Sequence, residues 1–280
     1  MLGLLVGVAA AVLVPRLLGA GDDPDPISVT QPTRVLSDDE VVDSPDDLLP
    51  DDVPLPPGSG AATAEAAVTG FLDAEVAGDF ETSFGFLSAE ERTIYGTPAG
   101  WVAAHADVVP PVTGYDIAEA SEGPDGTTVS GSVSFTPGLD QVVGLVPAEA
   151  RVTWLVTLGP DDAWGVSFEG STFEPLRPGD DGVAPAAQRW VDARQGCELP
   201  SNEFSGRIGS GPLAESLCEA DDVEVGGPEA LDDATDTEIA TAFGPETTDA
   251  ARLVRVTGDT ELGIVLVPIG EQWTVIGVVP

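Results

Sequence analysis

Histidine and tyrosine, two of the side chains that transfer protons in enzymes, are scarce in this sequence. The chain has one histidine, His105, and two tyrosines, Tyr95 and Tyr115. Imidazole and carboxylate groups are the usual general acids and bases of enzymes. His105 and Asp79, which belong to the same stretch of the chain, are therefore the candidate catalytic residues.

Both candidates also have a simpler interpretation. His105 follows Trp101 by four positions, so the two rings can touch on one face of a helix. Asp79 follows Gly78 at the start of a helical pattern, where aspartate commonly caps the first turn. We interpret His105 as a packing residue and Asp79 as a cap, and we predict that the chain is not an enzyme.

The two cysteines, Cys197 and Cys218, lie 21 positions apart. A zinc site would need further Cys or His ligands, and a redox pair would normally be Cys-x-x-Cys. In an exported chain two such cysteines predict one disulfide, which would stabilise the fold by about 3 kcal/mol. We expect no metal and no cofactor.

Composition excludes several classes of function. The chain has 49 acidic residues, ten basic residues, all arginine, and a net charge of −39. Without lysine it has no Walker A motif, no Schiff-base lysine and none of the lysine motifs of penicillin-binding enzymes. The negative charge argues against binding to nucleic acid. Two alternative explanations of the acidity stay open, a GC-rich genome and adaptation to high salt.

Two segments precede the folded part. Residues 1–20 are almost wholly apolar, with Arg16 as the one charge, and are long enough to span a bilayer. We expect a retained transmembrane anchor, with a cleaved signal peptide, and so a secreted protein, as the alternative. Residues 21–60 are rich in Asp and Pro and predict a disordered acidic linker. The expected location is the cell membrane, with the body outside the cytoplasm.

Residues 61–180 predict an α+β domain in which helices pack on a curved antiparallel sheet. Helical spacing places five residues on one face of a first helix, and helices are also expected over 79–88 and 98–107. Strands follow over 112–120, 127–136, 150–158 and 164–173. The five residues on the first helix face are Ala67, Val68, Phe71, Leu72 and Val76.

This domain resembles the nuclear-transport-factor-2-like, or ketosteroid-isomerase-like, superfamily. The similarity rests on Phe71-Leu72-Asp73-Ala74, Gly78-Asp79-Phe80, Leu87-Ser88 and Trp164-Gly165-Val166-Ser167-Phe168, and it is nearest the non-catalytic domain before the transpeptidase of some penicillin-binding proteins. The resemblance implies a cone-shaped fold and an envelope location. It also implies a possible apolar pocket, which would be lined by Phe71, Phe84, Trp101 and Trp154.

Residues 181–280 predict a second, smaller α+β domain that contains the disulfide. A helix is expected from Pro185, a short helix before Cys218, and a longer one over 228–243. Three strands over 251–256, 262–267 and 273–279 close the chain. This order, helices and then a meander, suggests a duplicated and shortened cone.

Three hypotheses for function follow. The first is a non-catalytic scaffold of the cell envelope that binds protein partners. The second is a module that holds a small apolar ligand in the cone pocket. The third, and weakest, is an enzyme similar to an isomerase or a dehydratase, which would need His105 or Asp79 inside that pocket.

Overall fold

The computed structural model describes residues 58–105, 109–197, 208–209 and 211–280. The expected anchor over 1–20 and all but the last three residues of the expected linker over 21–60 lie outside the described residues. Within the described part, no helix is long and apolar enough to cross a membrane.

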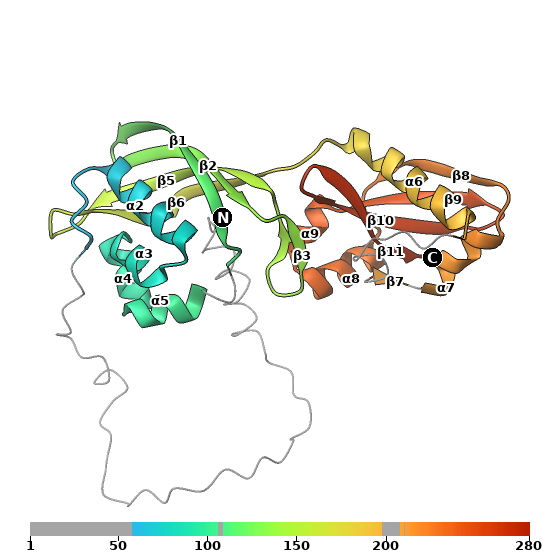
Figure 1. Ribbon diagram of the computed structural model, residues 1–280, viewed down its shortest axis with the longest axis horizontal. Helices are drawn as coiled ribbons and strands as arrows, with labels where there is room; N and C mark the ends of the chain where they lie inside the picture. The colour runs from blue at the N-terminus through green and yellow to red at the C-terminus, as the bar shows by residue number, and fades with distance from the viewer. Residues whose placement is uncertain (1–57, 106–108, 198–207, 210) are drawn as a thin grey trace, which may run out of the picture.

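The first domain contains helices on one face of an antiparallel sheet (Figure 1). The sheet has the order β1-β2-β5-β6. Buried Val, Ala and Trp side chains alternate along β2 and β5 and face the helices, while Ser and Thr side chains face the other way. The elements are α2 (Ala64–Ala77), α3 (Phe80–Gly85), α4 (Ala89–Tyr95), α5 (Pro98–His105), β1 (Val112–Gly123), β2 (Gly126–Phe135), β5 (Glu149–Leu158) and β6 (Trp164–Leu176).

Local signals explain the helix boundaries. Thr63 caps α2 by accepting a hydrogen bond from the backbone N–H of Ala66, and Gly78 ends the helix in the left-handed conformation at φ 68°. Asp79 caps α3, as predicted, by accepting from Thr82. Val76 was expected on the buried face but is 43% exposed, because the last turn of α2 buries the side that carries Ala74 and Glu75 instead.

Helix α4 was not predicted. Ser88 caps it by accepting from the backbone N–H of Glu91, so the sequence over 88–91 forms the first turn of a helix. The expected helices over 79–88 and 98–107 left the residues between them without an assigned element. The apolar residues of this seven-residue helix are too few to give a clear periodicity.

The second domain is a five-stranded sheet with the order β7-β11-β10-β9-β8, covered on both faces (Figure 1). Along β10, Leu262, Ile264 and Leu266 belong to the cluster under α6, while Val265 and Val267 belong to a separate cluster on the other face. The elements are α6 (Val183–Gln195), β7 (Ile208–Gly209), α7 (Gly211–Ser216), β8 (Val223–Glu229), α8 (Asp233–Phe243), α9 (Pro245–Ala250), β9 (Arg252–Gly258), β10 (Leu262–Ile269) and β11 (Gln272–Val279).

Two predictions for this domain need correction. The expected helix over 228–243 begins later than predicted: Pro228 and Glu229 end strand β8, and α8 begins after its cap Asp232 and ends at Phe243, as expected. Pro228 is accommodated in β8 because it lies on an edge strand beside a register shift. The domain also does not repeat the order of the first one, because β7 and β8 alternate with helices and β7 pairs in parallel with β11.

A hairpin of the first domain reaches the second. Strands β3 (Gly138–Asp140) and β4 (Gly144–Val146) form it between β2 and β5, and in Figure 1 it extends toward α8 and α9. Leu139 is 6% exposed and belongs to the same buried cluster as Ile239 and Phe243. The connection between the domains is also fixed, because Nε1 of Trp273 donates to the carbonyl oxygen of Gly179 at 3.1 Å.

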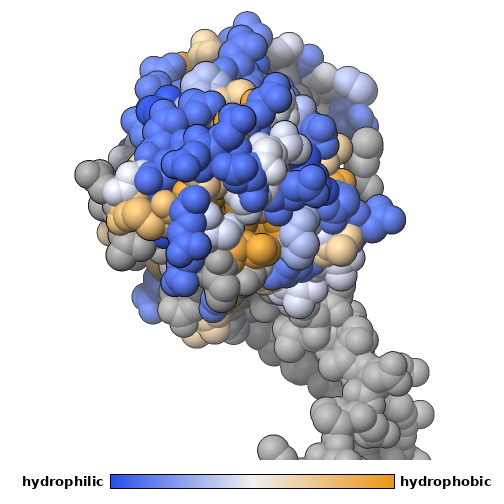
Figure 2. All heavy atoms as spheres, turned by 90° about the vertical axis from the view of Figure 1, so that its right-hand side faces the viewer, coloured by the Kyte–Doolittle hydropathy of each residue, from blue (hydrophilic) through white to orange (hydrophobic). Residues whose placement is uncertain are grey.

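The far end of the second domain is largely hydrophilic. Figure 2 shows this end as a surface of mostly polar residues with small, separate apolar spots. This distribution agrees with the acidic composition of the chain. The α+β class, the curved antiparallel sheet, the second sheet region and the single disulfide are confirmed.

Candidate functional site

His105 forms a buried pair with Glu75, which was not among the candidate residues of the sequence. Its Nε2 atom lies 2.6 Å from Oε2 of Glu75, although the two residues are 30 positions apart. Glu75 is on the last turn of α2, and His105 is the last residue of α5. Their side chains are 4% and 2% exposed, so the contact is between helices and inside the protein.

Aromatic rings surround this pair. Trp101 stacks on His105 with ring centroids 4.4 Å apart, and Phe80 and His105 form a T-shaped pair with ring centroids 4.7 Å apart. Trp101 also stacks with Phe168, at 6.0 Å between ring centroids, and its Nε1 atom donates a hydrogen bond of 2.9 Å to the hydroxyl of Ser83. The predicted contact of Trp101 with His105 therefore exists.

The Glu75–His105 pair has the composition of an acid–base dyad. A general base must lie within hydrogen-bond reach of the proton that it removes, and the buried position of this pair keeps it away from solvent. The burial therefore favours the packing interpretation of His105. Oε1 of Glu75 and Nδ1 of His105 have no hydrogen-bond partner among the described residues. Asp79 is not part of this arrangement: it is exposed and accepts hydrogen bonds from the backbone and the hydroxyl of Thr82.

A second buried carboxylate connects α4 to the sheet. Glu91 accepts a hydrogen bond of 2.8 Å from the backbone N–H of Phe168. Burial raises the pKa of Glu91, although hydrogen bonds from the backbone of Phe168 and Glu169 act in the opposite direction. Burial, and then the charge of Glu91, raise the pKa of Tyr95 to about 12.

The four residues expected to line a cone pocket are all in the core. Phe71 is 5% exposed, and Phe84, Trp101 and Trp154 are 1% exposed or less. They belong to one buried cluster between the helices and the sheet. Two surface hollows of the first domain include none of them in their lining. Ligand binding in a cone pocket stays a prediction.

Both hollows lie on the first domain. One, of about 440 Å³, is on the face of the sheet that the helices leave open, where Asp116, Ser132 and Arg151 follow one another across β1, β2 and β5. The other, of about 400 Å³, lies between the start of α2 and the end of the β1–β2 hairpin, and Trp164 is on its wall. Neither hollow was predicted from the sequence.

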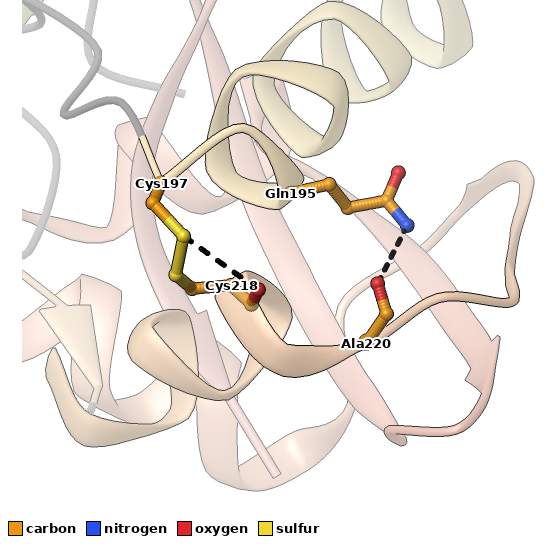
Figure 3. Close-up of a disulfide and its surroundings, with 4 residues drawn as sticks. All are labelled: Gln195, Cys197, Cys218 and Ala220. Atoms are coloured by element: carbon orange, nitrogen blue, oxygen red, sulfur yellow. Dashed lines mark hydrogen bonds between the residues drawn. A yellow bond between two sulfur atoms is a disulfide. The ribbon is translucent and has the colours of Figure 1, made fainter.

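The predicted disulfide is present (Figure 3). Cys197 follows α6 and is bonded to Cys218 in the short 3-10 helix Leu217–Glu219. Beside it, the side-chain amide of Gln195 donates a hydrogen bond of 3.1 Å to the carbonyl oxygen of Ala220. The sulfur of Cys197 lies 3.6 Å from the carbonyl oxygen of Cys218, and because a disulfide sulfur carries no hydrogen this is a contact only.

No group of three or more His, Cys, Asp or Glu residues in the described part of the chain is arranged to hold a metal ion. No family model, no curated protein and no solved structure matches this chain.

Proposed function

We propose that this protein is a non-catalytic, membrane-anchored scaffold of the cell envelope whose two domains bind protein partners outside the cytoplasm. The Cys197–Cys218 disulfide is the observation that carries the proposal. Disulfides persist in oxidising compartments and are rare in the cytosol. The apolar sequence over 1–20 supplies the expected anchor.

The contacts between the domains support a scaffold. The hairpin residue Leu139 is buried against the second domain, and the ion pair between Nε of Arg252 and Asp180, at 3.0 Å, connects β9 to the segment that follows the first domain. Two domains with such contacts present their surfaces at a fixed spacing. Three of the buried ionisable groups, Glu75, His105 and Glu91, each make one contact between elements that are distant in sequence.

Thiol labelling tests the location. Intact cells that express the full chain would be treated with a maleimide that cannot cross membranes, before and after an equally impermeant reductant. We expect labelling of Cys197 and Cys218 only after reduction, and none in a variant with both cysteines changed to serine. Labelling that needs lysis but no reductant would place the body in the cytoplasm and overturn the proposal.

Crosslinking in native membranes tests the scaffold. Because the chain has no lysine, amine-reactive crosslinkers have no side chain to react with, whereas its 49 acidic residues can be joined to partner lysines by a carbodiimide. We expect specific adducts that mass spectrometry maps to exposed carboxylates of the two domains. A chain that stays monomeric and forms no adduct would contradict the proposal.

A further inference from the structure

The Cys197–Cys218 disulfide lies at the surface of the second domain. Both cysteines are exposed, Cys197 just after α6 and Cys218 in the 3-10 helix (Figure 3). A disulfide breaks when a thiolate attacks one of its sulfur atoms, so exposed disulfides are the labile and regulatory ones. This bond is therefore placed where a reductant can reach it in the folded protein.

The backbone at Cys197 adopts a conformation that disfavours a side chain. Its φ is 56°, in the left-handed region, and in the described part of the chain only Asp162 shares a positive φ among residues other than glycine. Helix ends normally place glycine in this conformation, because a Cβ atom is crowded there. Reduction releases Cys197 from Cys218 and lets it leave this conformation, so the backbone strain favours the reduced form.

The bond also encloses strand β7 in a closed stretch of chain. β7 pairs in parallel with Gly277 and Val278 of β11, at the edge of the sheet. Its two residues are held by the burial of Ile208 and by a hydrogen bond of 3.0 Å from the N–H of Gly209 to Oε1 of Glu238. A crosslink limits the conformations that a released segment can take, so it favours the docked strand.

Other contacts hold the two cysteine-bearing elements together. Leu217, next to Cys218, is fully buried in the cluster under α6. The side-chain amide of Gln195 donates to the carbonyl oxygen of Ala220, beside the disulfide (Figure 3). Because α6 and the 3-10 helix keep these contacts without the bond, the element that depends most on the disulfide is the two-residue strand β7.

We propose that the Cys197–Cys218 disulfide is a redox-sensitive latch for β7, opened by a dithiol reductant outside the cytoplasm. One thiolate of the reductant attacks a sulfur of the bond, forms a mixed disulfide and displaces the other cysteine, which takes up a proton. The second thiol of the reductant then attacks the mixed disulfide. The protein gains two electrons and two protons, and the dithiol becomes a disulfide.

Opening the latch changes what the second domain presents. Release of β7 uncovers the backbone edge of β11 at Gly277 and Val278, and an uncovered edge can pair with the strand of another chain. The redox state thus controls an edge that is available to partners. This inference adds regulation to the proposed scaffold and rests on the oxidising location in which the bond forms.

Reduction kinetics test whether the bond is open to attack in the folded protein. The purified full chain, in a non-ionic detergent, would be treated with dithiothreitol in buffer and in concentrated urea, and free thiols would be counted by a maleimide that adds mass. We expect the rate in buffer to be within about tenfold of the rate in urea, because both sulfurs are exposed. A larger gap would mean that the bond opens only on unfolding, and would overturn the latch.

Hydrogen exchange followed by mass spectrometry tests the effect on β7. Peptides that cover β7 should exchange at least about tenfold faster in the reduced protein, because the loop constraint is lost. Peptides of β2 in the first domain should change less than about twofold. Oxidised glutathione should restore slow exchange. Equal exchange of β7 in both forms, lost protection along β10 as well, or a failure to recover on oxidation would each contradict the latch.

The variant with both cysteines changed to serine is the matched control. Its β7 peptides should exchange as in the reduced natural protein and should not respond to dithiothreitol. A response of this variant would show that the reductant acts elsewhere, and the inference would fail. If the bond forms in cells but resists dithiothreitol in the folded protein, the latch is wrong and the scaffold stands. If labelling in cells places the body in the cytoplasm, the location is wrong, and the purified protein still decides the latch.

Discussion

Gly144, at the start of β4 in the first domain, lies against the backbone carbonyl oxygen of Phe243, the last residue of α8 in the second. A Cβ atom at Gly144 would be 2.6 Å from that oxygen, and the residue has a φ of +84°, which side chains rarely adopt. Together with the burial of Leu139, this close approach makes the hairpin a joint between two domains that are otherwise separate in sequence.

Gly144→Ala should therefore destabilise the protein by about 2 kcal/mol, because the methyl group meets backbone and the backbone conformation is strained. Urea unfolding of the full chain measures this. Gly138→Ala, on the same hairpin, is the matched control, because a Cβ there meets nothing within 4 Å. Equal stability of the two variants would mean that the hairpin does not pack on the second domain.

Glu75→Leu should destabilise the fold by about 3 kcal/mol, because it leaves His105 buried without its partner. The double variant Glu75→Leu with His105→Phe should lose less than the sum of the two single changes, since it leaves neither group unpaired. Chemical denaturation of the natural protein, the two single variants and the double variant gives the coupling free energy between residues 75 and 105. Additive losses would show that the contact contributes nothing.

Glu91 should make stability depend on pH. Because burial raises the pKa of Glu91 above 4.5, the unfolded chain loses this proton first as the pH rises, and ionisation then favours unfolding. The destabilisation caused by ionising the buried Glu91 carboxyl is absent below pH 4.5, where the carboxyl is protonated in both states. It is complete once Glu91 is ionised in the folded protein as well. The free energy of unfolding of the natural protein, relative to that of Glu91→Gln, should fall across this range.

Glu81→Gln is the control for the pH experiment, because Glu81 is exposed in the first turn of α3. Its stability should follow that of the natural protein at every pH. If the difference in free energy of unfolding between the natural protein and Glu91→Gln stays constant from pH 4 to pH 8, burial does not disfavour the charged form of Glu91.

Replacing both Cys197 and Cys218 with serine should cost about 3 kcal/mol, the loop-closure value for a disulfide of this separation. The loss should be measured by urea unfolding under non-reducing conditions, and adding a reductant to the natural protein should reproduce it. A double-serine variant as stable as the natural protein would show that the 3-10 helix at Cys218 is held by its other contacts, such as Gln195 with Ala220.

Local patterns were enough to predict the elements that have strong signals. The alternating residues of β2 and β5, with Gly and Asp at the turns, gave strands close to those observed. The cap at Asp79 and the pairing of the two cysteines were also predicted correctly. The strands and the cap depend on residues that are close in sequence. The disulfide could be predicted because two cysteines can pair in only one way.

Short elements and distant partners could not be predicted in the same way. Helix α4 and strand β8 are seven residues each, too short for a periodicity that separates helix from strand. Glu75 gave no signal as the partner of His105, because one glutamate among many on a helix is usually exposed. Thr127 and Trp164 looked like ordinary strand residues until the fold placed them in one hollow.

The sequence by itself determined the α+β class, the strongly acidic surface and the disulfide, because composition, hydrophobic period and cysteine number act locally or over the whole chain. Only the tertiary structure decided that Glu75 faces His105, that Gly144 meets Phe243 and that Glu122 shares a hollow with Trp164. Such contacts depend on how helices and strands that are distant along the chain pack together, and this packing is a property of the complete fold.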